Sequence, residues 1–176
     1  EIYTLSLHDA LPIYQPNRLR SFLTFFCFIA LYAVGFGFLI LRLIREDAVG
    51  LYRGSLALPG FFPSQTNLEA FSLIALLTLA ISNAIVALDP VQINRRKNVL
   101  VNSLVLAGMI FSWYFLLIRS GNMIGALVMT IAEFLVSLIV ISMLYLVEHR
   151  AGYYFIPTLL WALFRIILSI FLVARN

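Results

Sequence analysis

The chain has 176 residues, of which 62% are hydrophobic and only 11% are charged, and its mean hydropathy is +1.00. Soluble domains are about 25% charged, so a chain this apolar could not cover its own surface in water, and we expect a lipid bilayer around it. The net charge of +4 comes from Arg and Lys residues scattered along the chain. This scatter favours loops at membrane surfaces over a nucleic-acid-binding patch, so no nucleic-acid partner is expected.

The first thirteen residues, EIYTLSLHDALPI, lack the basic start and the apolar core of a signal peptide. They match in full the translation of a common short-read sequencing adapter. We therefore expect residues 1–13 to be an artefact of sequence assembly and residues 14–176 to form a single membrane domain.

Charged residues bracket five apolar stretches, and each stretch has the roughly 20 residues that a membrane-spanning helix needs. Because β-barrel strands are shorter and alternate in hydrophobicity, the absence of such alternation excludes a barrel. The predicted fold class is an all-α integral membrane protein with a five-helix bundle. The expected helices cover residues 21–43, 68–88, 98–118, 121–147 and 151–174.

One connection, residues 45–67, is much longer than the turns that join the later helices. Loops of that length are uncommon and often functional. This one is rich in Gly and Pro, but it also carries apolar residues such as Phe61 and Phe62. We therefore expect it to pack on the bundle as a lid. Basic residues are divided almost evenly between the two sides, so they predict no orientation in the membrane.

Glu133 and Arg165 are charges inside the expected spans. A charge near the bilayer centre costs about 2.5–3.5 kcal/mol on insertion scales, so such residues usually face the bundle interior and pair. Each lies about 21 Å along its helix from the turn that joins the last two helices. We predict an intramembrane ion pair between them. It either only locks the two helices together or leaves Arg165 able to hold an anionic group of a ligand.

Several kinds of chemistry have no signal in the sequence. No Cys, His, Asp and Glu cluster has the spacing of metal ligands, and no glycine-rich phosphate loop is present. The spans also lack a Ser, His and Asp set. We therefore expect no catalytic residue and no metal site.

Two segments keep the spacing of a known pattern. Residues 150–169 read RAGYYFIPTLLWALFRIILS, and residues 51–64 read LYRGSLALPGFFPS. They resemble the fifth helix and the first loop of the TspO/MBR family, the tryptophan-rich sensory and translocator proteins. The matching residues are Ala151, Pro157, Trp161, Phe164 and Leu168 in the helix, Tyr52, Ser55, Leu56, Pro59, Phe61 and Pro63 in the loop, and Val101 and Asn102 in the third helix.

The chain also departs from the family pattern. It has only two tryptophans, Trp113 and Trp161, and the position that aligns with the family's loop tryptophan lies near Thr66. Thr158 stands where the family has Tyr, and Arg165 stands where it has a small residue. The resemblance therefore bears more strongly on the fold than on the ligand.

The resemblance implies a membrane receptor or sensor that binds a tetrapyrrole, porphyrin or haem, or another flat hydrophobic molecule, within the helix bundle. No cofactor is required, because the porphyrin or haem would be the ligand. Trp161 and Pro157 would form an aromatic wall of the pocket or only a packed kink, and Asn102 would contact ligand or join helices. The expected ligand-binding residues are Trp161, Pro157, Asn102, Tyr52, Phe61, Pro63 and Arg165.

Other functions stay open beside this one. The alternatives are a small transporter or scaffolding subunit without tetrapyrrole binding, and a porphyrin-degrading enzyme, against which the missing loop tryptophan argues. The resemblance also implies a homodimer, and a bacterial cell membrane is the expected location. The expected partners are the lipid bilayer, a hydrophobic small molecule and a second copy of the chain.

Overall fold

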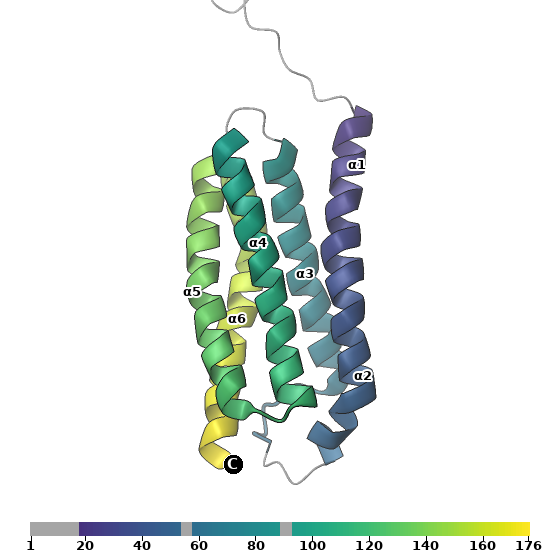
Figure 1. Ribbon diagram of the computed structural model, residues 1–176, viewed down its shortest axis with the longest axis vertical. Helices are drawn as coiled ribbons and strands as arrows, with labels where there is room; N and C mark the ends of the chain where they lie inside the picture. The colour runs from purple at the N-terminus through teal and green to yellow at the C-terminus, as the bar shows by residue number, and fades with distance from the viewer. Residues whose placement is uncertain (1–17, 54–57, 89–92) are drawn as a thin grey trace, which may run out of the picture.

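The computed structural model describes residues 18–53, 58–88 and 93–176, and Figure 1 shows them as a bundle of long, nearly parallel rods. Residues 1–13, expected to be an artefact, lie outside the described part of the chain. Five helical segments are long and apolar enough to cross a membrane. The described residues contain helices and no strands. The predicted all-α, five-helix membrane fold is therefore confirmed.

The first rod consists of α1 (Arg18–Ile29), η1 (Ala30–Phe36) and α2 (Gly37–Arg53). Its middle part, η1, is a wider π-helical turn, but the flanking residues Ile29 and Gly37 keep helical dihedral angles. The rod therefore continues through η1 without a break. Such π-helical turns are inserted into α-helices and often lie near functional sites.

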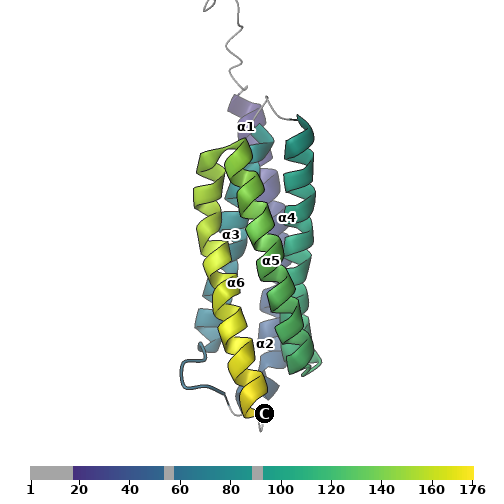
Figure 2. The same cartoon turned by 90° about the vertical axis from the view of Figure 1, so that its left-hand side faces the viewer.

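The other rods are α3 (Gln65–Leu88), α4 (Ile93–Tyr114) with its π-helical end η2 (Phe115–Arg119), α5 (Met123–Val147) and α6 (His149–Arg175). They pack in a ring in which the first rod contacts α3, α3 contacts α6, α6 contacts α5, and α5 contacts α4. Contacts of α2 with η2 close the ring. Figure 2, turned by 90°, shows α6 and α5 side by side at the front.

The structure corrects the predicted end of the first helix and the start of the long loop. The helix was expected to end at residue 43 and the loop to begin at residue 45, but α2 runs to Arg53. An ion pair one helical turn apart, from Arg42 Nε to Glu46 Oε1 at 2.9 Å, supports this extension. The connection is shorter than expected, and its residues 54–57 lie outside the described chain.

The fourth span begins at Met123, two residues later than expected. Gly121 has a φ of 63°, a left-handed conformation that favours glycine, and it separates η2 from α5. Asn122 then caps α5, because its side-chain oxygen accepts a hydrogen bond from the Gly125 N–H at 2.8 Å. This polar turn, not the apolar pattern, sets the start of the helix.

Large apolar side chains cover the outside of the bundle. Phe22 and Val128 are each 62% exposed, and Leu160 is 59% exposed. Polar and charged residues such as Glu133, Arg165 and Thr158 are instead fully buried. This distribution is the one that a bilayer selects, because the solvent outside is hydrocarbon and internal polar groups must pair within the protein.

Candidate functional site

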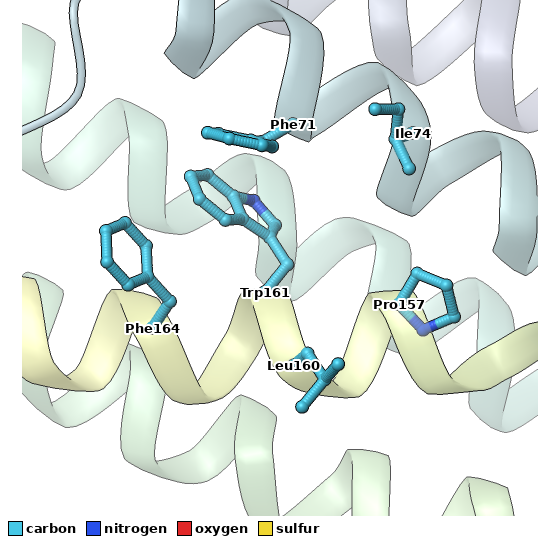
Figure 3. Close-up of a pocket in the computed structure, with 6 residues that line it drawn as sticks. All are labelled: Phe71, Ile74, Pro157, Leu160, Trp161 and Phe164. Atoms are coloured by element: carbon cyan, nitrogen blue, oxygen red, sulfur yellow. The ribbon is translucent and has the colours of Figure 1, made fainter.

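A groove of about 360 Å³ runs between α3 and α6 on the outer face of the bundle (Figure 3). Its volume is near the lower end of the roughly 300–1,000 Å³ that small-molecule sites occupy. All the side chains that line it are apolar, and four of the six are aromatic or Pro. The lining residues are Phe71, Ile74, Pro157, Leu160, Trp161 and Phe164.

Three aromatic rings form one wall of the groove. The ring centroids of Phe71 and Trp161 lie 5.2 Å apart, and those of Trp161 and Phe164 lie 5.5 Å apart in a stacked arrangement. Trp161 is only 6% exposed, whereas Phe71 is 45% exposed. Trp161 therefore forms the floor of the groove, and Phe71 forms its exposed outer edge.

Thr158 links α6 to α3, the two helices that form the groove, directly after Pro157. Pro157 has no N–H, so one hydrogen bond within α6 is missing at this level. The next residue bonds across the interface, because the Thr158 hydroxyl lies 2.8 Å from the Ala75 carbonyl oxygen and 3.0 Å from the Thr78 hydroxyl. These contacts hold α3 against α6 beside Pro157.

An ion pair lies inside the bundle behind Trp161. Arg165 Nη2 donates a hydrogen bond to Glu133 Oε1, and both side chains are 0% exposed. The structure thus brings together the two charges that the sequence places at matched depth on α5 and α6. Burial of one charge without the other would be costly, so each residue makes the other tolerable in the membrane interior.

Aromatic rings surround the Arg165 guanidinium. Its Cζ lies 5.1 Å from the Trp113 ring centroid, 5.8 Å from that of Tyr114 and 5.9 Å from that of Trp161. These are cation–π distances, since attraction extends to about 6 Å. Arg165 thereby contacts both the ion pair in the interior and the tryptophan that forms the floor of the groove.

Two hydrogen bonds fix the inner rings of this arrangement. Trp113 Nε1 donates to Ser169 Oγ at 3.0 Å, which joins α4 to α6. The Tyr114 hydroxyl is hydrogen-bonded to the Ser72 hydroxyl, which joins α4 to α3. The aromatic surroundings of Arg165 are therefore held from three helices.

The other expected binding residues lie away from the groove. Phe61 packs edge-on against Phe171 with a centroid distance of 5.0 Å, about 15 Å along α6 from Trp161. Pro63 is buried in the same segment. Asn102 lies between α4 and α5, where its Nδ2 donates to the Asn98 carbonyl at 2.8 Å and contacts Met143 Sδ. The Tyr52 side chain lies outside the described residues.

The arrangement contains residues that sequence patterns did not single out. Phe71, Ile74 and Leu160 line the groove, and Trp113 contacts Arg165. Phe71 and Ile74 are one turn apart on α3, but many apolar residues of this chain share that spacing. Only the packing of α3 against α6 selects them, so no local signal could have found them.

The comparison with known families settles the relationship that these features suggest. The TspO/MBR family profile matches residues 27–174, which is most of the chain. The chain belongs to the TspO/MBR family. Membership in the TspO/MBR family supports a role of the sensor or receptor type for this multi-pass membrane protein. A search of curated proteins found no match.

Proposed function

We propose that this TspO/MBR protein is a membrane receptor or sensor that holds a tetrapyrrole, or another flat hydrophobic ligand, in the groove between α3 and α6. The observation that carries the proposal is the aromatic wall in which Trp161 stacks on Phe164 and packs against Phe71 with an interplanar angle of 37°. A planar π-system gains both apolar burial and offset stacking against such a wall. The membership of the chain in the family gives the proposal its class of ligand.

The polarity of the groove limits how a ligand would lie in it. Arg165 is 0% exposed and engages Glu133, so it offers no free charge to a ligand in this conformation. A porphyrin would therefore place its ring system against Trp161 and direct its propionates out of the groove toward the membrane surface. Direct binding of a propionate by Arg165 would require the ligand to displace both Trp161 and Glu133.

Titration of the purified protein with protoporphyrin, followed by tryptophan fluorescence, tests the proposal. We expect saturable quenching, because Trp161 lines the groove. Quenching that rises linearly with no saturation would remove the proposal. Loss of bound porphyrin under light would favour the enzyme alternative, and porphyrin flux into liposomes without tight binding would favour a transporter.

A further inference from the structure

We propose that the buried Glu133–Arg165 ion pair fixes the position of Trp161 and thereby sets the ligand affinity of the groove. Glu133 and Arg165 act in this account as positioning residues, because neither lines the groove itself. The inference rests on the proposed function for its ligand-binding readout only. The position of Trp161 can be measured without any ligand.

Trp161 is shared by the groove and the buried ion pair. It is one of the groove residues, and its ring centroid lies 5.9 Å from Arg165 Cζ. The two residues are four positions apart on α6, so they lie on the same face of the helix. A shift of the guanidinium therefore reaches the floor of the groove through a direct contact.

The guanidinium depends on the aromatic rings for part of its stabilisation. Arg165 Nε and Nη1 have no hydrogen-bond partner among the residues that the structure describes, and neither does Glu133 Oε2. The hydrogen bond to Glu133 therefore uses only the Nη2 group of the guanidinium. The rings of Trp113, Tyr114 and Trp161 surround that remainder. Their attraction to the cation in turn holds Trp161 in place.

An ion pair that only joins α5 to α6 and an ion pair that also positions Trp161 require different placements of the two charges. Locking α5 to α6 needs one charge of each sign at this depth, on either helix. Holding Trp161 needs the cation on α6, one turn from the indole. Exchanging the two charges keeps the first condition and breaks the second, so the exchange separates the two roles.

The experiment uses the full chain with Trp113 replaced by Phe, which leaves Trp161 as the sole tryptophan. In this background we compare the exchange variant E133R/R165E with the neutral variant E133Q/R165Q. Ser137→Ala is the matched control, because its hydroxyl bonds only the Glu133 carbonyl of its own helix, at 2.8 Å. Each protein is measured for unfolding, for quenching of Trp161 by brominated lipid and for protoporphyrin affinity.

We expect the exchange variant to stay folded and to lose no more stability than its cation–π contacts supply. Its Trp161 should be quenched more strongly by brominated lipid, because the ring is released toward the groove. Its protoporphyrin Kd should rise by up to about thirtyfold, the equivalent of one desolvated cation–π contact. The neutral variant should show the same two changes even if the exchange variant does not fold, and Ser137→Ala should show neither.

Trp161 quenching and affinity that stay at background values in a folded exchange or neutral variant would overturn the inference. If the background itself does not bind protoporphyrin, the proposed function fails. The quenching by brominated lipid then still decides whether the ion pair positions Trp161.

Discussion

Thr158 donates its hydroxyl to the main-chain carbonyl of Ala75 at 2.8 Å, and this bond joins the two helices that form the groove. The bond lies next to Pro157, where α6 lacks a main-chain hydrogen bond of its own. A polar contact across the interface thus holds the helices together beside the position where α6 lacks a main-chain hydrogen bond. Trp161, which forms the floor of the groove, lies about one helical turn from Thr158 on α6.

Replacing Thr158 by Val removes this hydroxyl with little change in volume. We expect the free energy of unfolding to fall by about 0.6–1.7 kcal/mol, the range measured for hydrogen bonds between membrane helices. Unfolding in detergent micelles measures the change. Thr130→Val is the control, because the Thr130 hydroxyl bonds only carbonyls of its own helix. Equal losses in both variants would contradict the role of Thr158 as a cross-link.

Glu133→Gln should be more damaging than loss of the whole ion pair. It leaves Arg165 buried without a counter-charge, and breaking a buried pair in this way costs about 3–5 kcal/mol. Adding Arg165→Gln to the same chain should recover most of that stability, because no charge is then left in the interior. Unfolding of the single and double variants measures the coupling. Additive losses would show that the two residues do not stabilise each other.

Replacing Gly121 and Gly108 by Ala should change the free energy of unfolding in opposite directions. Gly121 has a φ of 63°, so Gly121→Ala should lower the free energy of unfolding by about 1–2 kcal/mol. Gly108 lies within α4, and a Cβ there would meet no atom within 4 Å. Gly108→Ala should therefore raise stability by up to about 1 kcal/mol, since alanine is the better helix former. A Gly121→Ala protein as stable as the parent would be inconsistent with the left-handed turn at Gly121, and a less stable Gly108→Ala protein would be inconsistent with open space at Gly108.

Phe71→Ala tests the outer wall of the groove. Phe71 is 45% exposed, so its loss should alter folding little. It should weaken protoporphyrin binding by up to about tenfold, because one aromatic contact is worth about 0.5–1.5 kcal/mol. Phe22→Ala is a suitable comparison, since Phe22 is 62% exposed on α1 and lies outside the groove. Equal affinities of the two variants would exclude Phe71 from the site.

Much of the fold could be predicted from the sequence, because each membrane-spanning helix is a long stretch of high mean hydropathy. The charges that bracket the spans predicted all five helices, and the resemblance in the last helix predicted the family that the profile match shows. Helix ends were less predictable. The helix α2 continues through the charged residues Arg42 and Glu46 and ends at Arg53, and the backbone of Gly121 delays α5. Neither effect appears in an average of hydropathy.

The groove was predictable only on its α6 side. Pro157 and Trp161 belong to a recognisable motif, whereas Phe71 and Ile74 reach the site only because α3 packs against α6. Glu133 and Arg165 could be placed at one depth by counting residues from their shared turn. The aromatic rings around Arg165 could not, because Trp113 comes from α4 and its approach depends on how three helices are arranged.

A pair of single-tryptophan proteins tests most directly whether the groove between α3 and α6 binds the ligand. Trp113→Phe leaves Trp161 in the groove, and Trp161→Phe leaves Trp113 fully buried beside Arg165. On titration with protoporphyrin, we expect saturable quenching of Trp161 in the first protein and a clearly weaker affinity in the second. The same affinity in both proteins, or no saturable quenching of Trp161, would contradict the assignment of the groove as the ligand site.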